Sequence, residues 1–114
     1  MKKVYCMLAA SALTLGTSVA MAAGAEAGKE KAAVCFSCHG ADGNSNTGQV
    51  PQPPKLAGQH ADYLIRAMQD YASGARSNPI MAAFAANLTD EDREDLAAYY
   101  ASLPSSLSLI SKTD

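Results

Sequence analysis

The sequence predicts an all-α fold, and three observations support this class. The chain of 114 residues is rich in alanine, poor in valine and isoleucine, and free of tryptophan, a composition that favours helix over sheet. Three segments, at about residues 25–36, 61–73 and 89–103, show helical spacing of apolar residues or helix-boundary residues. The chain is 48% hydrophobic and 18% charged, which suits one small globular domain.

Residues 1–22 have the features of a cleaved signal peptide. Two lysines precede a mostly apolar stretch, and the segment ends in the small-residue pattern A-M-A, which is typical of a cleavage site. The alternative is an uncleaved membrane anchor, but the apolar stretch is short and contains serine and threonine. We therefore expect a periplasmic protein without a membrane span in its mature form, with the folded domain at residues 23–104 and a flexible tail at residues 105–114.

The mature chain is predicted to be acidic. Removal of the signal peptide takes away two of the nine basic residues and none of the eleven acidic ones, which leaves a net charge of −4. The sequence has no basic stripe, so a nucleic-acid partner is not expected. An acidic surface favours docking to a basic patch on a protein partner.

The first predicted helix, at residues 25–36, contains one unusual residue. Its acidic residues Glu26 and Glu30 suit the positive end of the helix dipole. Gly28 costs about 1 kcal/mol relative to alanine inside a helix. Either another helix packs closely against Gly28 or this residue lies in a frayed first turn, and the sequence leaves both possibilities open.

The most informative stretch is Cys35-Phe36-Ser37-Cys38-His39, which has the C-x-x-C-H spacing of a c-type haem attachment site. The two thiols lie about one helical turn apart, so both can reach one edge of a porphyrin. The imidazole of His39 then faces the iron from the same side. The motif therefore predicts one haem c, bonded through Cys35 and Cys38, with His39 as an iron ligand.

Two other interpretations of the motif compete with haem. A thiol-redox enzyme would use Cys35 and Cys38, but a thioredoxin-like fold needs strands, and the sequence predicts none. A zinc site would add His39 and His60, but the adjacent Cys38 and His39 are awkward co-ligands, and the sequence has no second C-x-x-C pair. Both alternatives predict a colourless protein, whereas a haem protein is red.

A long loop and a second helix follow the motif. Residues 40–58 are rich in glycine, asparagine and proline, and wrapping around a flat ligand would account for a loop of this length. The helix predicted at residues 61–73 carries an apolar face, and Gly74 is its expected C-terminal stop.

The last part of the domain is predicted as an irregular segment and a third helix. Residues 75–88 are expected to be irregular because Asn78-Pro79 argues against a helix at its start. Thr89 is the expected N-cap of the third helix, and Pro104 ends it.

The iron needs a sixth ligand, and the mature chain offers His60, Met68 and Met81. Met68 belongs to an apolar helix face, where methionine usually fills the core. His60 stands among polar residues at the start of a helix. Met81 lies in the predicted irregular segment beside two alanines, which would allow a close approach to a porphyrin edge. Met81 is therefore the favoured ligand, with a simple core position as its alternative, and a thioether there would raise the reduction potential.

Taken together, these pieces resemble a class I cytochrome c, especially small periplasmic forms and one half of the dihaem periplasmic cytochromes. The resemblance implies the class I cytochrome c fold, in which three to four helices wrap around one covalently bound haem. It rests on six segments in order, namely Gly28-Lys29, Cys35 to Gly43, Pro54 to Gln59, Tyr63-Leu64, Asn78 to Met81, and Leu88 to Tyr100.

The resemblance also implies roles for individual residues. Cys35 and Cys38 would form the thioether bonds, His39 would be the proximal ligand, and Met81 the distal ligand. The carbonyl of Pro54 would accept the other imidazole N–H of His39 and so orient the ring.

Three further positions follow from the resemblance. Crossing of the first and last helices would place Gly28 against Tyr99 or Tyr100. Arg76 could meet a haem propionate, although this match is loose. The insertion at residues 49–53 departs from the tightest form of the family pattern and leaves the path of the loop open.

The expected function is periplasmic electron transfer without catalytic residues, because protein side chains would occupy both axial positions. The alternative is a cytochrome subunit dedicated to one periplasmic oxidoreductase complex. In either case the expected partners are redox proteins, such as an oxidase, a reductase or a dehydrogenase. They would dock through a small interface near Phe36, Ile80, Ala82 and Ala83.

Overall fold

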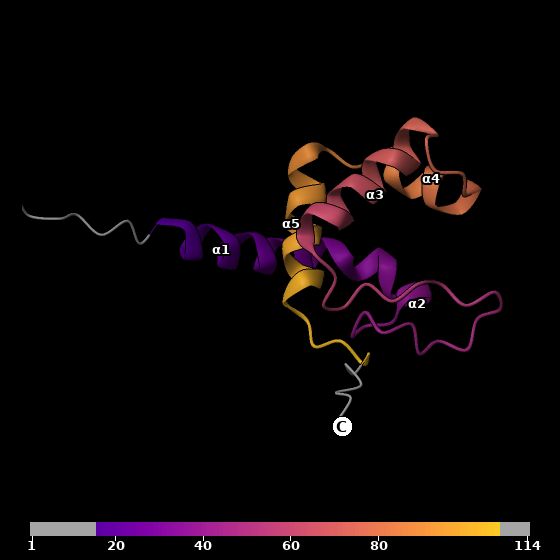
Figure 1. The fold of residues 1–114 in the computed structure, drawn as a ribbon, viewed down its shortest axis with the longest axis horizontal. Helices are drawn as coiled ribbons and strands as arrows, with labels where there is room; N and C mark the ends of the chain where they lie inside the picture. Colours follow the sequence, from indigo (N-terminus) through magenta and orange to yellow (C-terminus); the bar gives the residue numbers. More distant parts are fainter. Residues whose placement is uncertain (1–15, 108–114) are drawn as a thin grey trace, which may run out of the picture.

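The computed structural model describes residues 16–107, and the predicted all-α class is confirmed because this range contains helices and no strand. Figure 1 shows α1 crossing α5, with α3 beside α5 and α4 beside α3. Within the described range, no helix is long and apolar enough to cross a bilayer. The helical elements are α1 at Gly16–Lys31, the 3₁₀ helix η1 at Ala32–Cys35, α2 at Phe36–His39, α3 at Ala61–Ser73, α4 at Pro79–Ala85 and α5 at Asp90–Ser102.

The first helix is longer than predicted. It begins at Gly16 and so includes residues 16–22 of the predicted signal peptide, and after Lys31 the chain continues through η1 into α2. Residues 1–15 of the predicted signal peptide and residues 108–114 of the predicted tail lie outside the described residues. The domain boundaries therefore stay predictions.

Gly28 is buried where α1 crosses α5. A β-carbon at this position would collide with the backbone carbonyl of Asp95 and with the side chain of Tyr99. Of the two possibilities that the sequence left open, close packing of a second helix is therefore the correct one. Of the two tyrosines, Tyr99 is the one against which Gly28 packs.

The expectation of an irregular segment at residues 75–88 was wrong for residues 79–85, which form α4 at Pro79–Ala85. Pro79 takes one of the first positions of this helix, where a missing N–H costs nothing. Asn78 is the N-cap, and its side-chain oxygen accepts hydrogen bonds from the backbone N–H groups of Ile80 and Met81, both at 3.0 Å. The Asn-Pro pair starts the helix here instead of preventing it.

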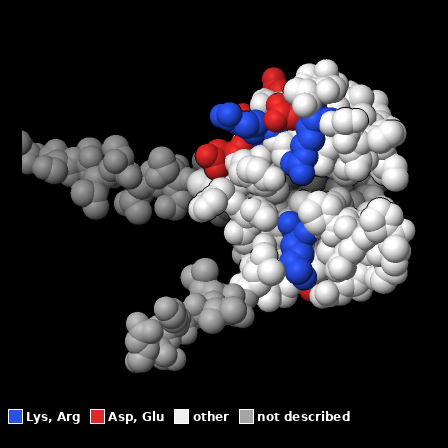
Figure 2. All heavy atoms as spheres, turned by 45° about the vertical axis from the view of Figure 1, so that its right-hand side comes forward, with Lys and Arg blue, Asp and Glu red and all other residues white. Residues whose placement is uncertain are grey.

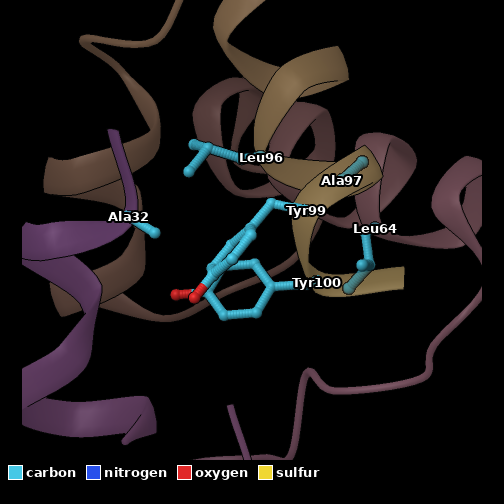
Figure 3. Close-up of a cluster of buried hydrophobic side chains, with 6 residues drawn as sticks. All are labelled: Ala32, Leu64, Leu96, Ala97, Tyr99 and Tyr100. Atoms are coloured by element: carbon cyan, nitrogen blue, oxygen red, sulfur yellow. The ribbon is translucent and has the colours of Figure 1, made fainter. Parts of the chain in front are cut away.

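The other two helices agree with the prediction. Helix α3 runs over Ala61–Ser73, and Gly74 ends it with a φ of 83° in the left-handed region. Thr89 caps α5, and it shares a reciprocal pair of hydrogen bonds with Asp92. Figure 3 shows the apolar core where these helices meet the start of η1, formed by Ala32, Leu64, Leu96, Ala97, Tyr99 and Tyr100.

Candidate functional site

A cavity of about 540 Å³ lies between α3, α4, α5 and the loop at residues 40–58. Side chains from five separated parts of the chain line it, and they include Cys35, Cys38, His39 and Met81. The structure thus brings together the four residues that the sequence singled out for holding a haem and its iron.

His39 is held in a defined orientation. It ends α2, it is only 5% exposed, and its Nδ1 lies 2.8 Å from the backbone carbonyl oxygen of Pro54. Because a carbonyl oxygen only accepts, Nδ1 carries the proton and Nε2 keeps its lone pair. A neutral imidazole fixed in this way is prepared to bind a metal through Nε2. The hydrogen bond to Pro54 that the resemblance implied is therefore present in the structure.

The sequence analysis missed the residue that positions the Pro54 carbonyl. Ser45 is fully buried, and its hydroxyl donates to the carbonyl oxygens of Pro53 and Pro54. The side chain of Gln52, from the insertion at residues 49–53, donates to the Ser45 carbonyl at 2.9 Å. A serine in a loop rich in glycine and asparagine carries no sequence signal for this role, because its partners lie eight and nine residues away.

The two cysteines of the motif are partly buried, and both face the cavity. Burial raises the pKa of the Cys35 thiol, and the adjacent hydroxyl of Tyr100 opposes that rise. The Tyr100 hydroxyl is itself buried, and together with Nε of Arg93 it lacks a hydrogen-bond partner among the described residues. A buried hydroxyl without a partner in the wall of a cavity is a group to which a bound molecule can supply the missing partner.

The structure separates the three candidates for the second iron ligand. His60 is exposed at the N-cap of α3 and does not line the cavity. Met68 and Met81 both line it, but Met68 also packs against the apolar core. Met81 is the methionine that α4 brings to the cavity without a place in that core.

Positive charge lines the cavity although the chain as a whole is acidic. Lys31, Lys55 and Arg76 are among its lining residues, whereas no aspartate or glutamate is. Figure 2 shows lysine and arginine side chains on both sides of a hollow in this face of the molecule. The charge of Lys31 is balanced by Asp92 at 2.8 Å and Asp95 at 2.7 Å.

Lys55 and Arg76 form no ion pair with a carboxylate within the described range. The ammonium group of Lys55 donates to the Asn44 carbonyl and to the Ser106 hydroxyl, each at 2.8 Å. The guanidinium group of Arg76 lies 4.9 Å from the centre of the Tyr71 ring. Two cations beside an apolar cavity fit a flat apolar ring system that carries carboxylates, which is the chemistry of haem.

The two alternative interpretations of the motif do not fit this geometry. A thioredoxin-like fold needs a sheet, and residues 16–107 contain no strand. A zinc site needs several ligands close together, and the described side chains offer no group of three or more histidine, cysteine, aspartate or glutamate residues that could hold a metal ion.

Comparison with known proteins identifies the family. A model of the cytochrome c family matches residues 25–104. The chain belongs to the cytochrome c family. The family carries haem c on a pair of cysteines with the spacing of Cys35 and Cys38, so haem c is the cofactor of this protein.

Cytochromes c4 are among the most similar members of the family. The chain is 51% identical to cytochrome c4 of Pseudomonas aeruginosa over 98 residues, which cover 84% of this chain and 47% of that protein. A crystal structure of reduced cytochrome c4 from Pseudomonas stutzeri superposes with a TM-score of 0.65 at 42% identity, covering 73% of this chain and 47% of that one.

Another relative has a name that states a redox role. It is the thiosulfate dehydrogenase electron acceptor of Stutzerimonas stutzeri, 39% identical over 112 residues that cover 91% of this chain and 50% of that protein. This chain spans about half the length of each of these three relatives. The class I cytochrome c fold and the resemblance to one half of a longer cytochrome are therefore confirmed.

Proposed function

We propose that this protein is a periplasmic one-electron carrier in which His39 and Met81 are the two axial ligands of the haem iron. The observation that carries the proposal is the joint lining of one cavity by the cysteine pair, by an imidazole already held through Nδ1, and by a methionine from α4. When bound, the haem supplies an iron that takes up and releases one electron.

The residues of the chain have separate tasks in this function. Cys35 and Cys38 hold the cofactor covalently, which prevents its loss outside the cytoplasm. The Pro54 carbonyl accepts from Nδ1 of His39 and so turns Nε2 toward the cofactor as a ligand. With haem bound, the Met81 thioether would be the second protein ligand and would exclude water from the iron. Because no axial position is left for a substrate, we propose electron transfer and no enzymatic activity.

The cations of the cavity rim support the binding of the cofactor's carboxylates. Lys55 and Arg76 hold their positions through the loop and through the aromatic rings of α3, and neither is neutralised by a carboxylate of the described chain. We propose that these two side chains stabilise the propionates and thereby reduce the cost of placing their charge beside an apolar cavity.

The exposed apolar side chains at the mouth of the cavity support docking to a redox partner there. Of the four residues expected at this patch, Ile80 is 65% exposed and lines the cavity. Phe36 packs against the core, and neither it nor Ala82 nor Ala83 lines the cavity. We propose that the patch consists of five exposed apolar side chains that line the cavity, namely Val34, Val50, Tyr63, Ile80 and Phe84. A small apolar interface suits the short-lived encounters of electron transfer.

A dedicated partner is the second candidate function. The similarity to a thiosulfate dehydrogenase electron acceptor favours it, since that relative is named for accepting electrons from one enzyme. Mixing the oxidised protein with that dehydrogenase and with an unrelated periplasmic dehydrogenase distinguishes the two. Reduction by only one donor supports a dedicated role, and reduction by both supports a general carrier.

Visible spectra of variants produced in a haem-maturing host test the ligand assignment. His39→Ala is expected to prevent a normal low-spin spectrum. Met81→Ala is expected to open the sixth position, to allow the reduced protein to bind carbon monoxide, and to lower the midpoint potential. Met68→Leu is the matched control, because Met68 also lines the cavity. Carbon monoxide binding by the Met68 variant and not by the Met81 variant would reverse the assignment.

The signal peptide predicted at residues 1–22 supports a periplasmic location. Cell fractionation followed by mass measurement of the red protein tests it. A mature N-terminus near residue 23 in the periplasmic fraction is expected, and haem-containing protein that keeps residues 1–22 in the membrane fraction would contradict it.

A further inference from the structure

The hydroxyl group of Tyr100 has no task in the function described so far. Tyr100 is 3% exposed, it lines the haem cavity, and its hydroxyl has no hydrogen-bond partner among the described residues. Leaving a buried donor unpaired is destabilising, and a phenylalanine would fill the same space without that cost. The presence of the hydroxyl therefore points to a partner that belongs to the haem-bound protein.

The ring of Tyr100 is held firmly in the cavity wall. The backbone carbonyl of Tyr100 accepts a hydrogen bond from the Gly58 N–H at 2.9 Å. The centres of the Tyr99 and Tyr100 rings lie 5.1 Å apart. A β-carbon on Gly43 would lie 3.0 Å from Cδ1 of Tyr100, so a glycine allows the loop to pack directly on the ring. The hydroxyl is thus placed by contacts from two sides and cannot turn away into solvent.

Cys35 packs against the core cluster that contains Tyr100, and both residues line the cavity, so the Cys35 sulfur is the partner that we assign to this hydroxyl. Burial raises the pKa of the Tyr100 hydroxyl, so the hydroxyl keeps its proton. After attachment of the cofactor, the Cys35 sulfur is a thioether. A thioether has no proton and can only accept a hydrogen bond, whereas the tyrosine hydroxyl can donate one.

We propose that the Tyr100 hydroxyl donates a hydrogen bond to the Cys35 thioether sulfur and thereby raises the reduction potential of the haem. The inference rests on the proposed electron-carrier function. Tyr100 is a positioning residue in this role, because it acts on the cofactor through the sulfur of Cys35.

The sign of the effect follows from the direction of the hydrogen bond. The O–H dipole presents its positive end to a sulfur that is bonded to the porphyrin. Reduction adds an electron to the cofactor, and a positive dipole end nearby stabilises the added charge. Surroundings that stabilise the reduced form raise the potential, and hydrogen bonds next to the cofactor are one of the means by which a protein sets it.

Tyr100→Phe tests this inference, with Tyr99→Phe as the matched control. Tyr99 lies one residue away in the same helix and is also buried, but it does not line the cavity. At a fixed solution potential, Tyr100→Phe is expected to lower the ratio of reduced to oxidised protein about twofold to fivefold, consistent with the loss of one hydrogen bond. The control is expected to leave this ratio unchanged.

Resonance Raman spectra of the haem protein identify the acceptor. The C–S stretching bands of the wild type and of Tyr99→Phe are expected to shift in deuterated water, and this shift is expected to disappear in Tyr100→Phe. A lowered potential with unchanged C–S behaviour would overturn the inference, since the hydroxyl would then act on another group.

Thermal unfolding of the same variants provides an independent outcome. If the hydroxyl has a partner in the haem protein, Tyr100→Phe lowers the unfolding temperature. A raised unfolding temperature with an unchanged potential means that the hydroxyl stays unpaired, and this overturns the inference. If the Tyr100→Phe protein is red and normally ligated but its potential is unchanged, only this inference is refuted. If the wild type is colourless, the proposed function itself is refuted.

Discussion

The two sides of this molecule are packed to different degrees. Where α1 crosses α5, Gly28 is buried and lets the two backbones meet. On the other side, the loop at residues 40–58 and helices α3 and α4 surround a cavity of about 540 Å³, and apolar side chains such as Ile80 remain exposed at its mouth.

This difference shows where the polypeptide completes its own core and where the cofactor must do so. At Gly28 the two helices pack directly against each other, so this contact does not require a ligand. The cavity side leaves apolar surface uncovered in the chain alone, and burying that surface is the main favourable term in folding. The haem is therefore expected to stabilise the two sides unequally.

The largest expected effect comes from removing the covalent attachment. In Cys35→Ala/Cys38→Ala, haem is no longer retained, and we expect a loss of about 4 kcal/mol or more in the free energy of unfolding, comparable with losing a tightly bound ligand. Amide hydrogen exchange should accelerate more at residues 40–58 and 79–85 than in α1 and α5. Equal acceleration on both sides would contradict the contrast between them.

A smaller effect is expected at the helix crossing. Gly28→Ala introduces a β-carbon that collides with the Asp95 carbonyl, and overpacking of this kind costs about 1–3 kcal/mol. The control is Gly24→Ala, whose β-carbon would lie 3.2 Å from a side-chain oxygen of Asp95 and would not collide with backbone. Chemical denaturation of the two haem proteins checks this, and equal stability of both variants would argue against close packing at Gly28.

The smallest expected effect concerns the ion pairs beside the crossing. Hydrogen bonds from Lys31 and from Thr89 lower the pKa of Asp92 from 3.8 to about 2. Because the pKa in the folded state is lower than in the unfolded state, the ionised group stabilises the fold above pH ~4, and this contribution is lost as the pH falls toward about 2.

Unfolding temperatures measured between pH 5 and about 2 test this contribution. The wild type is expected to lose stability more steeply in this range than Asp92→Asn, which has no carboxylate to protonate. Glu91→Gln, which removes a neighbouring exposed carboxylate, is the control and should follow the wild type. Parallel curves for the wild type and Asp92→Asn would show that the pair with Lys31 has no effect on stability.

The helix ends illustrate both the success and the limit of local patterns. Thr89 and Gly74 were correctly predicted as helix boundaries, because capping depends on residues within one turn of the chain. The same reasoning failed at Asn78-Pro79, where one dipeptide can either block a helix or begin one. The choice depends on whether the proline falls inside the helix or at its first positions.

The sequence by itself determined the helical class, the attachment of haem through Cys35 and Cys38, and the identity of His39 as the histidine beside them. These features depend on spacing within a few residues, and such spacing is readable along the chain. Only the tertiary structure decided that Tyr99 packs against Gly28, that Ser45 holds the Pro54 carbonyl, and that Met81 joins His39 in one cavity. Each of these contacts joins residues far apart in the sequence, and their distances exist only after the helices have packed.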